Sequence, residues 1–257
     1  MIKTQYRAES GHWYAQNGDP AYTIVGANGN ERNTTLRDAR KHALVPSVTS
    51  VLGIADKPAL TNWKLDRALE ASLRLSQWNG ETDQQFIGRC KREAKKIGQT
   101  AAKRGSEIHA KIELGFLFGA DTAEYVAVRA VIDELYPNET WHAEASFCTE
   151  GYGGKIDLHS DSGIFIDFKT KDNLDVETAS RLVYDEHGMQ LSAYANGKRF
   201  YNPERCSIFI DRDDVSKVCH YVWDKETHKK HLKMFKNLLG YWQLTKNYQS
   251  GDRENDI

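Results

Sequence analysis

The sequence has few cysteines and no long apolar run, and both shortages narrow the classes of protein to which it can belong. Its four cysteines, Cys90, Cys148, Cys206 and Cys219, form no CxxC pair. That spacing argues against a zinc ribbon or an iron–sulfur cluster, so buried free thiols in a reducing cytosol are expected. No run approaches the roughly 20 apolar residues of a membrane-spanning helix. No secretory signal follows Met1, so we expect a soluble, cytoplasmic protein with no membrane partner.

The sequence also lacks a strong net charge. Lysine and arginine number 35 and aspartate and glutamate number 36, which gives a net charge of −1. Any surface for a polyanion must therefore be a local basic patch that acidic residues elsewhere offset. The 257 residues, 40% of them hydrophobic and 28% charged, are sufficient for a globular domain with a sizeable core.

The order of the expected elements indicates an α/β (α+β) fold with a central mixed sheet and an N-terminal helical region. Composition and periodicity divide the chain into four regions. They are an N-terminal arm and lead-in (1–60), a helical region (61–137), a core of strands and helices (138–248) and a polar tail (249–257). Strands are expected at 141–149, 154–160, 164–170, 205–211 and 217–223, and helices at 184–200 and 225–248. This order favours one compact domain over separate domains.

The arm and the helical region have their own local signals. In the arm, a short hairpin is expected around 22–25, and a brief helix at 35–40 that Thr34 or Thr35 caps. An apolar turn at 46–52 then leads into the body. Further helices are expected from Trp63 through Leu73, from Asp83 onward and at 123–135, and Gly98 or Gly105 could divide the second of these.

The second of these helices carries the densest basic segment of the chain. Its basic residues are Lys91, Arg92, Lys95, Lys96, Lys103 and Arg104. A basic helix is typical of a surface that follows a phosphate backbone, whereas Glu93 and Glu107 favour the alternative of a solvated helical face. Three aromatic side chains of this region could stack on bases, although core packing is the simpler expectation for each: Trp63, Trp78 and Phe86.

The strands expected at 154–160 and 164–170 carry the residues with the clearest chemistry. Because strand side chains alternate between faces, Asp157 lies opposite the aliphatic residues of its strand, and Asp167 and Lys169 share the corresponding face of the next strand. The short, turn-rich link between the strands predicts an antiparallel hairpin. In the right register, the two acids and the amine converge on one site.

Two carboxylates that meet on a sheet repel each other, and a hard divalent cation such as Mg²⁺ or Mn²⁺ resolves that conflict. Such an ion would polarise a phosphodiester oxygen and help to deprotonate water, while Lys169 would hold the water or offset charge in the transition state. The alternative is a solvated strand face with an ordinary cross-strand ion pair, which a short Asp-x-Lys match alone favours. The Gly-x-x-Asp strand at 154–157 reverses that preference.

Two helices offer further site residues. Gly105, His109 and Glu113 are four residues apart on one helical face, and imidazole is a ligand for transition metals and acceptable for Mn²⁺. Gln190 and Tyr194 also share a helical face, where Gln190 could brace the lysine or a phosphate and Tyr194 could contact a DNA backbone. Packing remains the simpler explanation of His109 alone, and a half-buried amphipathic helix is an equal alternative for the other two.

These motifs occur in an order that resembles a known family. A helical Gly-x-x-x-His is followed by a strand glutamate, Gly-x-x-Asp, Asp-x-Lys and Gln-x-x-x-Tyr, and the match spans roughly residues 35–200. The pattern resembles the RecB-type branch of the PD-(D/E)XK nucleases, which includes mitochondrial genome-maintenance exonucleases and many bacteriophage exonucleases. The segments 35–40, 46–52 and 57–60, together with Trp63, are especially similar to the phage members.

The resemblance implies a restriction-endonuclease-like core and a Mg²⁺- or Mn²⁺-dependent DNA exonuclease of phage-type recombination, repair or degradation. The implied metal ligands are His109, Asp157, Asp167 and the main-chain carbonyl of Phe168. Lys169 is implied to be catalytic, and Glu144, Gln190 and Tyr194 to support the site. Some relatives carry a four-cysteine iron–sulfur cluster, which the cysteine spacing here cannot reproduce.

Two other functions stay open at this point. One is an endonuclease specialised for a branched or end structure, and the other is a catalytically silent DNA-binding protein with the nuclease fold. The expected partner is DNA with an end, single- or double-stranded, and a homo-oligomer or a recombination partner protein is compatible with the resemblance. For a phage-encoded chain the compartment would be the host cytoplasm.

Overall fold

A computed structural model describes residues 12–249 of the chain, which form two compact units. The larger unit contains residues 12–54 and 109–249, and the smaller unit contains residues 55–108. The polar tail expected at 249–257 lies outside the described residues except for Gln249, and so does the segment that follows Met1. Within the described residues, no helix is both long and apolar enough to cross a membrane.

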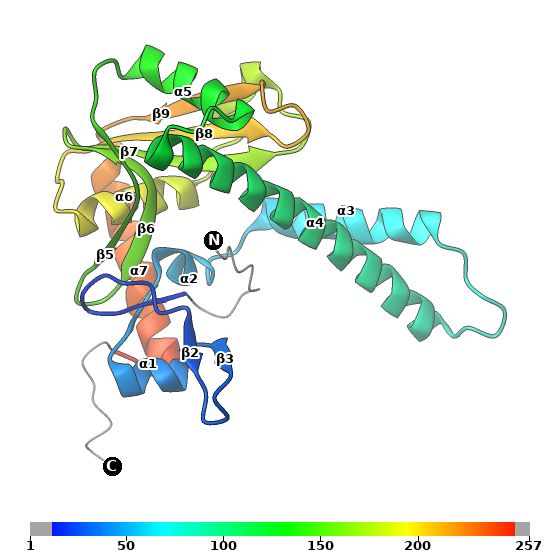
Figure 1. Cartoon of the computed structure of the whole chain (residues 1–257). Helices are drawn as coiled ribbons and strands as arrows, with labels where there is room; N and C mark the ends of the chain where they lie inside the picture. Colours follow the sequence, from blue (N-terminus) through cyan, green and yellow to red (C-terminus); the bar gives the residue numbers. More distant parts are fainter. Residues whose placement is uncertain (1–11, 250–257) are drawn as a thin grey trace. The chain divides into compact units, whose positions relative to one another are not determined.

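A five-stranded mixed sheet forms the centre of the larger unit (Figure 1). The strands are β5 (Trp141–Cys148), β6 (Gly153–Ser160), β7 (Ile164–Lys171), β8 (Glu204–Asp211) and β9 (Val218–Trp223), adjacent in that order. Only β7 and β8 are parallel neighbours, and the other pairs are antiparallel. The five expected strands are confirmed to within a residue at each end, because alternating apolar residues between turn signals mark them clearly.

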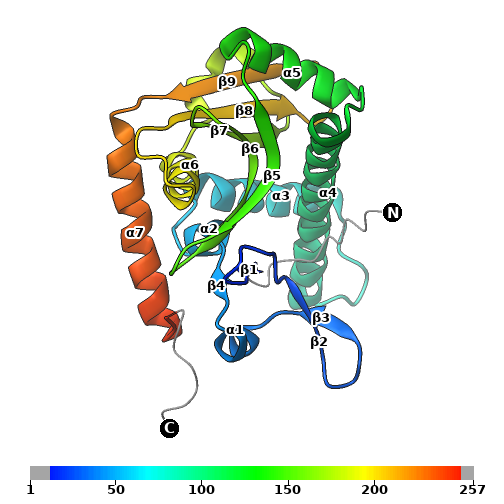
Figure 2. The ribbon, with the colours of Figure 1, turned by 60° about the vertical axis from the view of Figure 1, so that its left-hand side comes forward.

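Helices flank this sheet, so the predicted fold class is confirmed. They are α5 (Ala123–Leu135), the 3₁₀ helix η1 (Val176–Arg181), α6 (Asp185–Gly197) and α7 (Thr227–Lys246). The segment that contains η1 and α6 connects the parallel strands β7 and β8, which a tight turn cannot join. Helix α6 packs against both of these strands, and α7 lies alongside α6 (Figure 2). Aliphatic and aromatic side chains of the sheet, α6 and α7 meet in one core.

The N-terminal arm packs on this core and contains the short elements that the sequence signals indicated. They are β1 (Trp13–Tyr14), the hairpin β2 (Thr23–Val25) and β3 (Glu31–Asn33), α1 (Leu36–His42), β4 (Val45–Pro46) and α2 (Val48–Leu52). Thr35 caps α1 in a capping box with Asp38, as the threonine before the apolar run predicts. The apolar turn expected at 46–52 is instead a short helix, because the Ser47 side chain accepts the Ser50 N–H and Val51 is buried.

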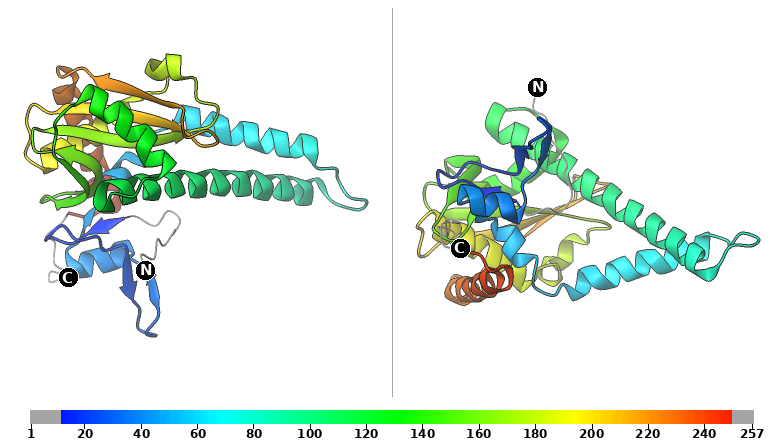
Figure 3. Two further views of the ribbon diagram at one scale, coloured as in Figure 1. Left: turned by 45° about the horizontal axis from the view of Figure 1, so that its top comes forward. Right: turned by 90° about the horizontal axis from the view of Figure 1, so that it is seen from below.

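The smaller unit consists of α3 (Pro58–Arg74) and most of α4 (Asp83–Phe118), joined by residues 75–82 (Figure 3). Helix α4 is continuous over 36 residues, so the expected division at Gly98 or Gly105 is wrong. A β-carbon at Gly98 would come no closer than 3.6 Å to the Trp63 ring, so nothing at that position forces a break. Each glycine lowers helix propensity by about 1 kcal/mol relative to alanine, which the long run of good helix formers around it outweighs.

Candidate active site

The β6–β7 hairpin is antiparallel, as expected, and it opens where the two acids lie. Its paired residues are Leu158 with Ile166 and His159 with Phe165. Asp157 and Asp167 follow next to the Leu158–Ile166 pair. They form no main-chain pair with each other. There the Phe168 N–H donates to Asp157 Oδ2 at 2.9 Å, so a side chain takes the place of a strand carbonyl. This exchange holds the Asp157 carboxylate between the strands.

Asp167 is the most deeply buried acid of the site. Its side chain is 2% exposed, and the Lys169 ammonium lies 2.5 Å from its Oδ2 atom. Burial raises the pKa of Asp167; the Lys169 charge opposes that rise, and the neighbouring Asp157 charge adds to it. The three residues that carry the chemical interpretation are therefore brought together, with one carboxylate in a place that favours a compensating positive charge.

Gln190 of α6 fixes this acid and this amine relative to each other. Its Nε2 donates to Asp167 Oδ1 at 2.7 Å and to the Tyr194 hydroxyl at 3.0 Å, while its Oε1 accepts from Lys169 Nζ at 3.1 Å. Both amide hydrogens and the amide oxygen are thus engaged, which determines the orientation of the group. The one-turn spacing of Gln190 and Tyr194 places both over the same part of β7.

His109 of α4 lies beside Asp157. Its Nδ1 is 3.8 Å from Asp157 Oδ2, and its ring meets the Phe168 ring edge-on with centroids 6.1 Å apart. The imidazole is 35% exposed, so it has contact with solvent as well as with the acid. The structure therefore brings the histidine to the acids, in a position where it could act as a ligand or as a hydrogen-bond partner.

Two consecutive glycines at the start of β6 allow aromatic rings to approach the site. A β-carbon at Gly153 would lie 2.7 Å from the Tyr14 side chain, and one at Gly154 would lie 2.8 Å from the Tyr194 ring. Both distances are shorter than real contacts, so only glycine admits these rings. Tyr14 of the N-terminal arm therefore reaches the strand that carries Asp157.

Tyr14 is a site neighbour that sequence reasoning missed. Its hydroxyl lies 2.5 Å from the Tyr22 hydroxyl, and its ring is 2% exposed. Burial raises its pKa strongly, and the charges of Tyr22, Tyr194 and Asp157 raise it further, so the phenol is neutral beside the acid. In the sequence, Tyr14 is visible only as an aromatic residue in an otherwise polar arm. Its place next to β6 depends on long-range packing, which the sequence does not show.

Glu144 and the basic residues of α4 complete the set of predicted site residues. Glu144 has a φ of 56° in β5 and lies across from Asp157, since Ala143 and Ala145 pair with the residues on either side of that acid. Its carboxylate forms an ion pair with Lys155. The six basic residues Lys91, Arg92, Lys95, Lys96, Lys103 and Arg104 all belong to the smaller unit, and the last two lie 3.9 and 3.8 Å from Glu107.

The donor set can be compared with what a divalent cation requires. Among residues 12–249, no three His, Cys, Asp or Glu side chains are grouped so as to hold a metal ion. Mg²⁺, however, usually takes one or two carboxylates and keeps several waters. Asp157 and Asp167 supply such a pair, and the Asp167 side chain is only 2% exposed, so its charge requires compensation within the site. The two carboxylates therefore fit a water-rich Mg²⁺ or Mn²⁺ site.

The chain matches no family model and no curated protein, but several solved structures are similar to it. An alkaline exonuclease from Laribacter hongkongensis is 12% identical over 73% of this chain and 95% of its own, with a TM-score of 0.36. A phage-related exonuclease from Haemophilus somnus 129PT is 13% identical over 54% and 81%, with a TM-score of 0.31. SSO0001 is 17% identical over 44% of this chain and only 56% of its own, with a TM-score of 0.26. These values are too low to assign a family or an activity.

Proposed function

We propose that this chain is a metal-dependent nuclease of the PD-(D/E)XK type that hydrolyses phosphodiester bonds in DNA. The observation that carries the proposal is the buried Asp167 carboxylate, with the Lys169 amine 2.5 Å away and Asp157 on the adjoining strand. An ordinary solvated ion pair would not bury its acid to 2% exposure beside a second acid. This arrangement supports a site that binds a cation and a phosphate.

Each residue has a role that its contacts allow. Asp157 uses Oδ2 for the Phe168 N–H, and no other residue among 12–249 donates to its Oδ1, which leaves that oxygen for a ligand. Lys169 engages Asp167 and Gln190, and its three donor hydrogens leave one for a phosphate oxygen or an attacking water. A divalent ion bound at the acids would polarise the phosphate and lower the pKa of a bound water.

Gln190 and Tyr194 act through the residues that they hold. By bonding both Asp167 and Lys169, Gln190 fixes the orientation of the amine relative to the acid with which it pairs. Tyr194 is 4% exposed, and its hydroxyl accepts a hydrogen bond from Gln190 Nε2. We therefore assign Gln190 and Tyr194 positioning roles and place neither in direct contact with DNA.

The finer part of the proposal is an exonuclease of the RecB-type branch, acting on DNA ends in phage-type recombination, repair or degradation. It is supported by the order of the sequence motifs, from the Gly-x-x-x-His helix to the Gln-x-x-x-Tyr helix. A role for His109 as a third ligand is supported by its place beside Asp157. The ion would be Mg²⁺ or Mn²⁺, since oxygen donors dominate the site and imidazole is tolerated best by Mn²⁺.

A metal-titrated cleavage assay tests the proposal. Linear single- and double-stranded DNA and covalently closed circles would be incubated with Mg²⁺, Mn²⁺ or EDTA, and labelled products separated by size. We expect metal-dependent mononucleotides or short products from linear DNA and intact circles. Cleavage of the circles would overturn the exonuclease assignment in favour of an endonuclease, and the absence of metal-dependent products from every substrate would overturn the nuclease assignment.

A catalytically silent DNA-binding protein is the second candidate. It is favoured by one observation, the absence of a three-ligand metal group among residues 12–249. In that case Lys169 and Asp167 would be a structural ion pair, and DNA would bind equally well in EDTA and in Mg²⁺. The same assay, read for binding as well as cleavage, separates the two candidates.

A further inference from the structure

Trp78 lies in the connection between α3 and α4, and its side chain is directed to solvent. It is 65% exposed, so the expectation that it packs in a core is wrong. Tryptophan is seldom exposed to this degree, because its large apolar ring gains free energy from burial. The smaller unit therefore presents an aromatic ring on its surface at a place where packing does not require one.

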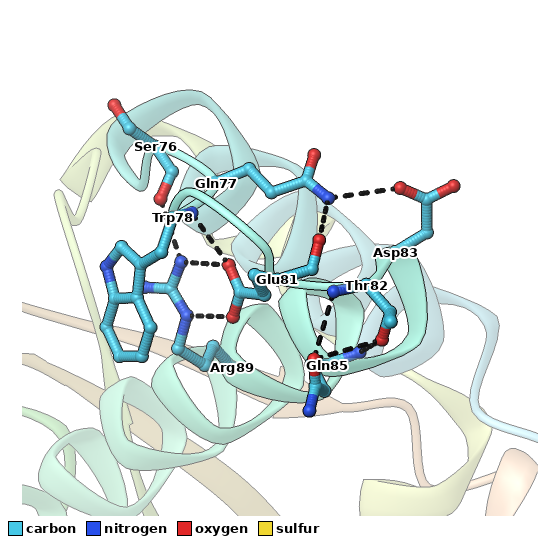
Figure 4. A network of polar contacts seen from close by, with 8 residues as sticks. All are labelled: Ser76, Gln77, Trp78, Glu81, Thr82, Asp83, Gln85 and Arg89. Atoms are coloured by element: carbon cyan, nitrogen blue, oxygen red, sulfur yellow. Dashed lines mark hydrogen bonds and ion pairs between the residues drawn. The ribbon is translucent and has the colours of Figure 1, made fainter.

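The Trp78 main chain and the arginine beside its ring belong to one polar network (Figure 4). The Arg89 guanidinium lies 3.9 Å from the centroid of the Trp78 ring and covers one part of it. Arg89 Nε and Nη2 donate to the two carboxylate oxygens of Glu81 at 2.7 and 2.8 Å, and Nη2 also donates to the Ser76 carbonyl at 2.8 Å. The Trp78 N–H donates to Glu81 Oε2 at 3.1 Å. These bonds hold the Trp78 main chain and the Arg89 guanidinium, which lies over the ring.

The low exposure of the Arg89–Glu81 pair indicates that it is a well-defined part of the structure. The side chains of Arg89, in α4, and Glu81, in the connection before it, are 14% and 5% exposed. Bidentate arginine–carboxylate pairs have a specific geometry. The Arg89–Glu81 pair therefore limits the motion of the Trp78 ring that lies against it. Trp78 is thus an exposed ring with little conformational freedom left to lose on binding.

A pocket of about 480 Å³ adjoins the ring. Its lining includes Trp78, Gly80, Gln84, Gln85, Gly88 and Arg92. Gln85 uses its Oε1 on Thr82, so its amide NH₂ remains to donate, and amide groups can bond the edge of a heterocycle. Gly88 carries no side chain on the helix face that lines the pocket, which keeps it open. The volume falls within the range of sites for small planar groups.

The side chains that continue along α4 are basic. Lys91, Arg92, Lys95 and Lys96 are all exposed, and they follow the pocket within two helical turns. A rigid aromatic ring, amide donors and a row of cations are together the features that bind single-stranded nucleic acid, in which bases stack and phosphates follow the charges. A protein partner would have no comparable need for the row of cations.

We propose that Trp78 is a stacking site for a nucleobase of single-stranded nucleic acid, with Arg89 bound beneath the indole and Arg92 beside the pocket. The proposal deepens the proposed function, on which it rests for the choice of DNA, because it assigns base contact to the smaller unit and cleavage to the larger one. It predicts that the protein distinguishes a strand with bases from a strand of the same charge without them.

Binding in EDTA tests the stacking site without any cleavage. The probes are oligothymidylate of about twelve nucleotides, which suits a single-strand site, and an abasic strand of the same length and phosphate count. We expect the wild-type protein to bind the strand with bases about tenfold more tightly, since stacking of one base accounts for roughly that factor. Trp78→Ala should bind both strands alike, and Trp78→Phe should keep much of the preference.

The control variant is Tyr241→Ala, which removes an aromatic ring of similar exposure, 60%, from α7 of the larger unit. The Tyr241→Ala variant should keep the full preference for the strand with bases. The melting temperatures of all variants, compared with wild type, show whether each remains folded. The difference in fluorescence between wild type and Trp78→Phe gives the emission of Trp78. Quenching of this emission by oligothymidylate would report the contact directly. A Trp78→Ala protein that keeps the wild-type preference for bases, or emission from Trp78 that oligothymidylate leaves unchanged, would overturn the proposal.

The two proposals fail in different ways. A protein that cuts no DNA in Mg²⁺ or Mn²⁺ but shows the Trp78-dependent preference contradicts only the nuclease assignment. A protein that cuts DNA while Trp78→Ala keeps its preference contradicts only the stacking site. Oligouridylate in place of oligothymidylate shows whether the base site accepts RNA as well as DNA, since the stacking chemistry is shared.

Discussion

The two units of this chain differ in how much they bury. In the larger unit, the sheet, α6, α7 and the N-terminal arm enclose a continuous core that includes polar groups such as Asp167 and Arg205. In residues 55–108 only Ala71, Cys90, Gly105 and Ile108 are buried. Leucines on one face of α3 remain largely exposed, with Leu73 at 86%.

The difference indicates a division of tasks. Positioning two acids and an amine to within hydrogen-bond distance requires rigid elements, which the packed larger unit provides. A surface that contacts a flexible strand requires charge and an aromatic ring, but little core, and the smaller unit has these features. If the division is correct, substitutions in the two units should have different kinds of effect.

The largest effect should come from the acids and the amine. Asp157→Asn or Lys169→Ala should lower the single-turnover cleavage rate by at least about 10²–10³-fold, because each removes a group that stabilises transition-state charge or the ion. Melting temperature and DNA affinity should stay close to wild type. A variant that loses stability together with activity would show that the pair is structural.

The converse variant lies in the smaller unit. Lys95→Ala combined with Lys96→Ala should weaken DNA binding and leave the cleavage rate of bound DNA unchanged. Each lost phosphate contact lowers the slope of log affinity against log salt by roughly 0.7 for a single strand. A titration from low to moderate salt measures this slope, and an unchanged slope would remove α4 from the DNA-binding surface.

Stability should depend most on a buried arginine of the larger unit. Arg205 is 0% exposed and donates to Ser192, Thr227, His231 and the Asp224 carbonyl at 2.7–3.0 Å. Arg205→Met leaves these acceptors unsatisfied, so urea denaturation should show a loss of about 3 kcal/mol. The exposed Lys96→Met should change stability by no more than about 0.5 kcal/mol. Equal losses would contradict the contrast between the units.

Glycine substitutions should have opposite signs in the two units. A β-carbon at Gly154 would lie 2.8 Å from Tyr194 and 2.9 Å from Phe147, so Gly154→Ala should destabilise by about 1–3 kcal/mol. At Gly98 the nearest contact is an ordinary 3.6 Å, so Gly98→Ala should stabilise α4 by about 0.5–1 kcal/mol. Thermal melts followed by circular dichroism measure both changes, and destabilisation by Gly98→Ala would show closer packing there.

A histidine-based pH dependence can come only from the larger unit, because residues 55–108 contain no histidine. Burial, with the Arg205 and His231 charges, lowers the pKa of His228 from 6.5 to about 4. Between these values the unfolded chain binds a proton that the folded chain does not, so stability is full above 6.5 and falls as pH drops towards 4. His228→Gln should flatten this fall in denaturation curves, whereas the exposed His220→Gln should leave it unchanged.

Local signals accounted for most of the elements. The strands, the hairpin and the capped helix α1 follow from alternation, turn residues and Thr35, all of which act over a few residues. The continuity of α4 through Gly98 and the helix at 48–52 were missed, because neighbouring helix formers and the burial of Val51 outweigh the local preference. The placement of Asp157, Asp167 and Lys169 on one face of the hairpin was predictable from the two-residue period of a strand.

The sequence by itself determined which residues could do chemistry and which face of a strand each would occupy, since covalent spacing and periodicity are local properties. The tertiary structure alone decided that β7 pairs with β8, that Gln190 bonds both Asp167 and Lys169, and that Tyr14 lies against Gly153. It also decided that Trp78 is exposed beside the Arg89–Glu81 ion pair, whose side chains are largely covered. Burial and contact depend on how distant segments share one core, and no short sequence window contains that information.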